Sequence, residues 1–153
     1  ILLTGASSGV GRHLAKSLAG EGAQITCCAR RRAELDSVVA EIEAAGGKAN
    51  AQVCDVADAD SIVAAFDGAE AAAGLVDSVI CNAGINVAGP AHSITVEDLD
   101  RIMSINLRGA FLTAQQGAKR MMRSRAGLFS SLQSLGARQR LELRYIRQRK
   151  LPC

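Results

Sequence analysis

Three glycines lie between a short apolar run and an amphipathic segment at the very start of the chain. Residues 1–18 read ILLTGASSGVGRHLAKSL, with the glycines at positions 5, 9 and 11. Gly5 allows a tight turn, and Gly9 allows a bulky anion to approach the backbone closely. Gly11 allows a helix to pack closely on a strand. The pattern predicts a strand, a glycine-rich turn and a helix over residues 9–20. In α/β folds this connection binds nucleotides, because the free amides of the first helical turn and the helix dipole favour phosphate.

The remaining sequence alternates between two hydrophobic periods. Short apolar runs typical of buried strands are separated by segments whose apolar residues recur three and four positions apart, as in helices. We predict strands over residues 1–3, 23–29, 49–56 and 75–84, and helices over residues 9–20, 32–45, 58–73, 95–104 and 106–123. This order implies a doubly wound parallel sheet with helices on both faces, the Rossmann-type α/β fold. Only two apolar residues precede the serines of GLFSS, so we expect a short fifth strand and a sheet that is incomplete at its C-terminal side.

The composition fits a single domain. Of 153 residues, 48% are hydrophobic and only 3% are aromatic, which favours a layered α/β core built from Ala, Val, Ile and Leu. We place a dinucleotide-binding domain at residues 1–136 and an atypical basic tail at residues 137–153, because six of the last sixteen residues are cationic. The net charge of +3 therefore leaves the body near neutral, which argues against a nucleic-acid-binding protein.

The apolar runs and the cysteines indicate the cell compartment in which the protein is expected. No run approaches the roughly 20 residues of a membrane span, and no basic-then-apolar signal peptide opens the chain. The five cysteines include no CxxC pair, and those in apolar runs are expected to be buried thiols in a reducing compartment. We therefore expect a cytoplasmic protein without a membrane partner, whose true N-terminus lies a few residues upstream. His13 and His92 lack metal-spaced partners and are interpreted as surface residues, so no metal site is expected.

Four motifs follow one another along the chain. They are Thr4-Gly5-x-x-x-Gly9-x-Gly11, CDV at 54–56, CNAG at 81–84 and INLRGAF at 105–111. Through these motifs the chain resembles the short-chain dehydrogenase/reductase family, in particular its 3-oxoacyl-carrier-protein reductases. The resemblance implies NAD(P)-dependent hydride transfer between nicotinamide and a small-molecule carbonyl or secondary alcohol. It also implies a homo-oligomer that forms through the helix over residues 106–123.

The resemblance further implies which residues hold the cofactor. In that family the glycine turn holds the pyrophosphate, the residue matching Asp55 lies beside the adenine, and the segment that Asn82 begins steadies the central sheet and the ribose. The expected cofactor-binding residues are Thr4, Gly5, Ser7, Ser8, Gly9, Gly11, Arg30, Asp55, Val56, Asn82, Ala83 and Gly84. Two alternatives stay open: the glycine turn can be a connector that binds nothing, and Asn82 and Asn106 can simply satisfy backbone groups.

The end of the second predicted strand favours one cofactor. Family members that prefer NAD carry an acidic residue there to accept both ribose hydroxyls, whereas this chain has Ala29 followed by Arg30, Arg31 and Arg32. A guanidinium fork matches a doubly anionic 2'-phosphate, so we expect NADP(H) to be favoured over NAD(H), with Arg30 as its ligand. The alternative is a solvated cationic start of the next helix, which fits Arg32 best.

The catalytic residues that the resemblance implies are Asn106, Ser131 and Tyr145. Asn106 would order a proton-relay water, Ser131 would polarise the substrate oxygen, and Tyr145 would transfer the proton. The family places a Lys four residues after the Tyr, on the same helix face, where its charge lowers the pKa of the phenol. Here Arg149 takes that position and Lys150 lies one residue further along. The alternative hypothesis is therefore a catalytically impaired dinucleotide-binding fragment without turnover.

The sequence after Gly136 departs most from the family. Arginines replace the Ala/Gly/Ser-rich sequence that is expected around the active-site helix. A frameshift, a splicing difference or a truncated gene would explain this, and a genuine basic tail that binds an acidic partner is the rival interpretation.

Overall fold

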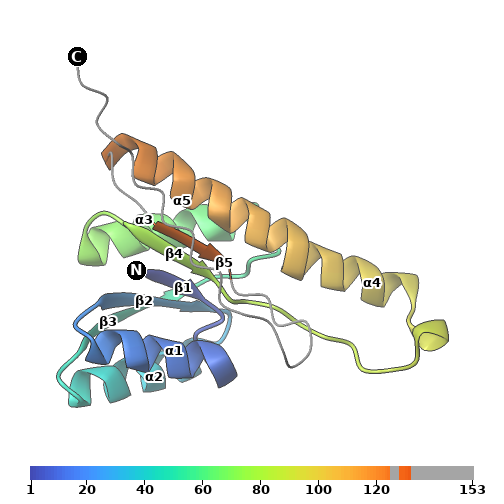
Figure 1. The fold of residues 1–153 in the computed structure, drawn as a ribbon, viewed down its shortest axis with the longest axis horizontal. Helices are drawn as coiled ribbons and strands as arrows, with labels where there is room; N and C mark the ends of the chain where they lie inside the picture. The colour runs from blue at the N-terminus through green and yellow to red at the C-terminus, as the bar shows by residue number, and fades with distance from the viewer. Residues whose placement is uncertain (125–127, 132–153) are drawn as a thin grey trace.

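The computed structural model describes residues 1–124 and 128–131, which form a parallel sheet and its flanking helices (Figure 1). The strands are β1 (Leu2–Thr4), β2 (Gln24–Ala29), β3 (Lys48–Val53), β4 (Ser78–Cys81) and β5 (Leu128–Ser131). The helices are α1 (Gly9–Gly20), α2 (Arg32–Ala44), α3 (Ala59–Ala73), η1 (Ala91–Ser93), α4 (Val96–Ile102), η2 (Met103–Gly109) and α5 (Ala110–Ser124). Tyr145, the predicted domain boundary at residue 136 and the basic tail lie outside the described residues.

The sheet has the strand order β3-β2-β1-β4-β5, and every strand pair is parallel. At its centre, Leu3 of β1 is level with Cys27 of β2 on one side and with Ile80 of β4 on the other. Helices α1 and α2 cover one face, and α3 and α5 cover the other (Figure 1). This confirms the predicted doubly wound α/β fold. The order of the strands reverses between β1 and β4, which is where such folds leave a crevice.

Adjacent residues of β1 enter two separate cores, because successive side chains of a strand lie on opposite faces. Leu3 packs in a cluster with Leu35 of α2, and Leu2 packs in a second cluster with Phe66 of α3. All four side chains are buried. Burying an apolar side chain of this size stabilises the folded state by about 1.5–3 kcal/mol, so the two cores hold β1 firmly between the helix layers.

The cysteines and histidines lie where the sequence predicted them. The free thiols of Cys27, Cys28, Cys54 and Cys81 are buried, and both histidines are exposed. Burial raises the pKa of the Cys27 thiol to about 11 and that of Cys81 to about 12. These thiols therefore act as small apolar core residues.

The segment after β4 differs from the prediction. Instead of two helices over residues 95–104 and 106–123, α4, η2 and α5 form one continuous helical run, and η2 is π-helical. Side chains donate hydrogen bonds to backbone carbonyls at the C-terminal end of η2. The Thr113 hydroxyl donates to the Gly109 carbonyl at 2.8 Å. The Cys81 thiol donates to the Ala110 carbonyl at 3.5 Å. A π-turn shifts the phase of the apolar stripe, so one α-helical period does not describe the whole run, and the sequence pattern predicts two helices where the structure has one.

Two predicted strands are too long. β3 ends at Val53 rather than at residue 56, and β4 covers residues 78–81 rather than 75–84. The polar segments that follow both strands leave the sheet at its carboxyl edge as loops. These loops carry the candidate site.

One partly buried arginine, Arg120, joins α5 to α3. The Arg120 guanidinium donates to the Asp67 carboxylate at 2.7 Å and to the Glu70 carboxylate at 2.6 Å, and it lies 5.3 Å from the centre of the Phe66 ring. This contact fixes the long helical run against the sheet. Among the residues that the structure describes, no helix has the length and apolar character needed to cross a membrane.

Candidate functional site

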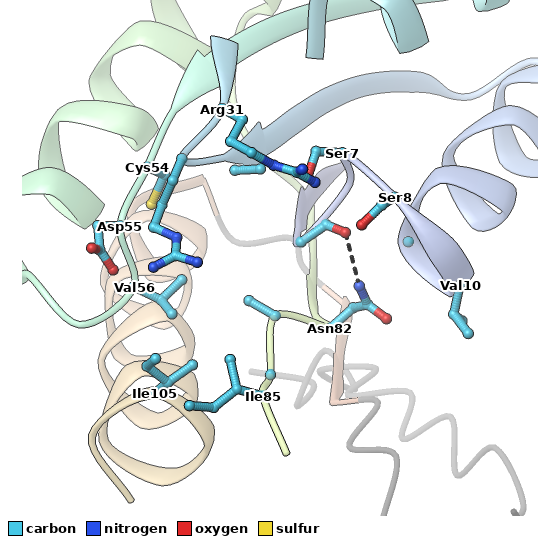
Figure 2. A pocket seen from close by; sticks show the side chains of 16 residues that line it. Ser7, Ser8, Val10, Arg31, Cys54, Asp55, Val56, Asn82, Ile85 and Ile105 are labelled. Carbon is cyan, nitrogen blue, oxygen red and sulfur yellow. Dashed lines mark hydrogen bonds between the residues drawn. The ribbon is translucent and has the colours of Figure 1, made fainter. Parts of the chain in front are cut away.

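A cavity of about 330 Å³ opens at the carboxyl edge of the sheet, where the strand order reverses (Figure 2). The glycine turn after β1, the ends of β2 and β3, the loop after β4 and η2 all contribute to its wall. The lining residues are Gly5, Ser7, Ser8, Val10, Gly11, Ala29, Arg30, Arg31, Cys54, Asp55, Val56, Asn82, Ala83, Gly84, Ile85 and Ile105. A cavity of this size is in the range of ordinary ligand pockets.

The glycine turn needs two of its glycines for their backbone conformation. Gly5 has φ 69° and Gly9 has φ 53°, in the left-handed region that L side chains rarely adopt. A Cβ atom on Gly9 would meet no atom of the described chain within 4 Å. Ser8, which precedes α1, makes no side-chain capping bond to the helix. The turn therefore leaves open space in front of the N-terminus of α1, which is suited to an anion.

Gly11 has a different role, because it allows α1 to lie directly against the end of β1. A Cβ atom on Gly11 would stand 2.2 Å from the Gly5 carbonyl oxygen and 2.5 Å from the Asn82 side-chain nitrogen. No atom can be accommodated at these distances. The close helix-to-strand packing that the sequence predicted for Gly11 is therefore present.

Thr4 and Asn82 join the ends of β1 and β4 beneath the cavity. The Thr4 hydroxyl oxygen accepts from the backbone amides of Asn82 and Ala83, both at 3.1 Å. The Asn82 side-chain amide donates to the Thr4 carbonyl at 3.0 Å and to the Gly5 carbonyl at 3.3 Å, the bond drawn in Figure 2. Thr4 is buried and does not line the cavity. For Asn82, these bonds match the alternative role of satisfying backbone groups at a strand end, although the residue also lines the cavity.

The three arginines after β2 occupy different environments. Arg30 lines the cavity and, within residues 1–124 and 128–131, has no hydrogen-bonding or ion-pair partner. Arg31 lies beside Ser7 in the cavity wall (Figure 2) and donates to the Ser7 hydroxyl at 3.3 Å. It also pairs with Glu34 at 3.1 Å. Arg32 does not line the cavity. Its Nε pairs with Asp36 one turn along α2 at 2.8 Å, as expected for a solvated helix start.

A tight turn follows β3 at the same side of the cavity. The Asp55 carboxylate accepts from the Ala57 amide at 3.0 Å, and the Asp55 amide donates to the Ser61 hydroxyl at 2.9 Å. Cys54 lies at the start of the turn, where burial and then the neighbouring Asp55 charge raise the pKa of its thiol to about 11. The thiol thus lines the cavity in its unreactive protonated form.

Asn106 reaches the loop after β4 from η2. Its side-chain oxygen accepts from the Ile85 amide at 2.9 Å, and its side-chain nitrogen donates to the Ile85 carbonyl at 2.8 Å. Asn106 itself is not among the lining residues, whereas its neighbour Ile105 and its partner Ile85 are. These two hydrogen bonds to the backbone of Ile85 correspond to the alternative that Asn106 satisfies backbone groups.

The other two predicted catalytic residues are less fully placed. Ser131 is the last residue of β5, where its backbone is level with Cys81 of β4. It therefore lies at the same edge of the sheet as the cavity. Tyr145 belongs to the residues that the structure does not describe.

Six lining residues were not predicted. They are Val10, Ala29, Arg31, Cys54, Ile85 and Ile105. All six are adjacent in sequence to a predicted site residue, so widening each predicted set by one position would have included them. Ile105 is adjacent to Asn106, and its side chain enters the cavity because η2 runs along that side. Only the packing of η2 against the loops could show this.

Known proteins are similar to this chain in both sequence and fold. The family model for short chain dehydrogenases matches residues 1–143. A D-threitol dehydrogenase from Mycolicibacterium smegmatis is 34% identical over 136 residues, which cover 89% of this chain and 52% of that protein. The structure of a 3-ketoacyl-ACP reductase from Sinorhizobium meliloti 1021 superposes with a TM-score of 0.80 at 34% identity, covering 85% of this chain and 51% of that one.

A third relative was solved with a ligand. This metagenomic short-chain oxidoreductase, in complex with NADP, superposes with a TM-score of 0.80 at 33% identity and covers 92% of this chain and 64% of that one. The chain spans about half the length of the curated relatives it matches. The glycine turn, the parallel sheet and the matched family model lead to one conclusion: the chain belongs to the short-chain dehydrogenase family of oxidoreductases.

Proposed function

We propose that this chain binds NADP(H) and belongs to an oxidoreductase that moves hydride between nicotinamide and a small-molecule carbonyl or secondary alcohol. The observation that carries the proposal is the cavity in front of the glycine turn, with Arg30 and Arg31 at its β2 side. When bound, the cofactor supplies a hydride donor or acceptor. The chain itself supplies the binding, the orientation and the exclusion of water.

The glycine turn fits a pyrophosphate group. The open space at Gly9 and the uncapped start of α1 favour an anion there, and the hydroxyls of Ser7 and Ser8 add donors. Asp55 and Val56 would border the adenine, and Ala83 and Gly84 would border the ribose on the nicotinamide side.

Arg30 is the proposed ligand of the 2'-phosphate. It has no competing ion pair within the described part of the chain, so its guanidinium is free to bind a doubly charged group. Arg31 is restrained by Ser7 and Glu34, and it would contribute positive charge nearby. The metagenomic relative in complex with NADP supports the same choice of cofactor.

For catalysis we propose that Ser131 polarises the substrate oxygen, Tyr145 transfers the proton and Asn106 supports the relay. The bonds of Asn106 to Ile85 fix its position beside the cavity. The second candidate is an impaired dinucleotide-binding fragment, because Arg149 stands where the family has Lys. A guanidinium fork does not replace a compact ammonium that contacts both a ribose and a phenol.

We further propose that two copies associate through the long helical run. Its exposed apolar residues are Val96, Leu99, Met103, Leu107, Phe111 and Met122. Four of these are spaced four residues apart, so they form one stripe. Phe111→Glu should shift the sedimentation equilibrium toward monomer, whereas Leu75→Glu, at an exposed apolar residue away from the stripe, should not. The buried free thiols suit a reducing compartment, and we place the protein in the cytoplasm.

Calorimetric titration with NADPH tests cofactor binding directly. Gly9→Ala should weaken NADPH binding at least tenfold, because the methyl group occupies the open space in front of α1. Gly46→Ala is the matched control, since Gly46 also has a positive φ, of 82°, and open space around it, but the residues beside it do not line the cavity, whereas Ser8 and Val10 beside Gly9 do. Both variants carry similar backbone strain, so equal affinities for NADPH would contradict the proposed site.

A further inference from the structure

The turn after β3 is held from two directions. From its own side, the Asp55 carboxylate accepts the Ala57 amide at 3.0 Å, and the Ser61 hydroxyl accepts the Asp55 amide at 2.9 Å. From the other side, Arg108 of η2 donates from Nη1 to the Ala57 carbonyl at 2.8 Å, across 51 residues of sequence. Both polar groups of Ala57 therefore have partners, and the turn is fixed at its far end by a residue outside the cavity.

Backbone packing supports the same contact. A Cβ atom on Gly109 would stand 2.6 Å from the Val56 carbonyl oxygen, so η2 lies directly on the turn. The neighbouring Ile105 lines the cavity, and Asn106 is bonded to Ile85 in the loop after β4. One π-helical segment thus contacts both loops that border this side of the cavity.

We propose that Arg108 is a positioning residue for adenine recognition, an inference that rests on the proposed binding of NADP(H). Arg108 is exposed and does not line the cavity, so it acts through the turn. One Asp55 carboxylate oxygen is already bonded to Ala57, and the residue borders the cavity. The orientation of this carboxylate toward the exocyclic amine of an adenine therefore depends on the peptide that Arg108 holds.

Loss of the Arg108 contact should affect one part of the ligand only. Arg108→Ala should weaken NADPH binding about three- to tenfold, the range for one hydrogen bond at an exposed site. The deamino analogue of NADPH has hypoxanthine in place of adenine and lacks the exocyclic amine. Its affinity should change by less than twofold, so the preference of the chain for NADPH over the analogue should shrink.

The experiment titrates the full chain with NADPH and with deamino-NADPH in a calorimeter. The variants are Arg108→Ala, Arg108→Lys, which keeps a donor and should recover part of the preference, and Arg101→Ala as the control at an exposed arginine of α4. Equal losses for both ligands would show a general structural role and overturn the inference, as would an unchanged preference in Arg108→Ala. If the unmodified chain binds neither ligand, the proposed function itself fails, and the inference fails with it.

Discussion

The side-chain amide of Asn82 donates to the backbone carbonyl of Thr4 at 3.0 Å, and the Thr4 hydroxyl accepts the backbone amide of Asn82 in return at 3.1 Å. These two residues are 78 positions apart in sequence. Their reciprocal hydrogen bonds join the carboxyl ends of β1 and β4, where the strand order reverses. The floor of the cavity therefore depends on the hydrogen bonds between these two residues.

Thr4→Val should destabilise the fold more than its small change in shape suggests. The variant leaves the amides of Asn82 and Ala83 without their acceptor, and each unsatisfied buried group costs about 1–3 kcal/mol. Urea unfolding should show a loss of about 2–4 kcal/mol. Thr113→Val is the control, because within the described part of the chain the Thr113 hydroxyl makes a single hydrogen bond, which it donates to the Gly109 carbonyl. A larger loss at Thr113 than at Thr4 would contradict this account.

Two glycines of α1 should respond in opposite ways to alanine. Gly11→Ala brings a methyl group to within 2.2 Å of the Gly5 carbonyl oxygen, so the helix must move away from β1 and the protein should lose most of its stability. Gly20→Ala meets no atom within 4 Å and should stabilise the helix by about 0.5–1 kcal/mol. Thermal unfolding of the two variants measures the difference. A tolerated Gly11→Ala would show that the turn can relax.

The fold could be predicted from the sequence, because the two hydrophobic periods and the glycine turn both specify a parallel α/β sheet. The helix over residues 9–20 is present with the predicted bounds. The continuous run through η2 could not be predicted, since the π-helical segment packs on Val56 at Gly109, and these two residues are far apart in sequence. For the same reason, the motifs indicated Asn106 but not its bonds to Ile85 or the entry of Ile105 into the cavity.

Arg30→Ala should separate the two cofactors. A charge-assisted bond to the 2'-phosphate contributes about 1.5–3 kcal/mol, so affinity for NADPH should fall roughly ten- to a hundredfold while affinity for NADH is unchanged. Arg32→Ala is the matched control, because Arg32 pairs with Asp36 and lies outside the cavity. Fluorescence titration with both cofactors measures the ratio. An equal loss for NADPH and NADH in Arg30→Ala would indicate a structural role.

Acid should weaken the contact between α1 and α2. Hydrogen bonds from Lys16, at 2.8 Å, and from Arg12 hold the pKa of Glu41 below its ordinary value. The unfolded chain therefore binds more protons than the folded one near the ordinary pKa of about 4.3, and stability must fall as pH drops through this range. Urea unfolding between about pH 6 and pH 3 should show a smaller decline for Glu41→Gln than for the unmodified chain.

The control for this pH dependence is Lys16→Met, which removes the largest cause of the lowered pKa and keeps the carboxylate. Its decline should lie between those of the other two proteins. Identical declines in all three proteins would show that Glu41 does not contribute to the acid sensitivity.

Turnover is the last prediction, and it depends on the cation that follows Tyr145. A phenol with its ordinary pKa of about 10 is only roughly one part in a thousand ionised at pH 7, so it is a poor base without an aligned cation. Residue 149 is four positions after Tyr145 and would share its helix face, whereas residue 150 would point about 140° away.

We therefore expect slow NADPH oxidation with ketones and 3-oxoacyl thioesters, and a gain of at least tenfold in Arg149→Lys. Lys150→Arg should change nothing, and Tyr145→Phe should remove the gain when combined with Arg149→Lys. Fast turnover by the unmodified chain that Tyr145→Phe abolishes would show that the guanidinium suffices, whereas equally slow rates in every variant would favour a dinucleotide-binding fragment.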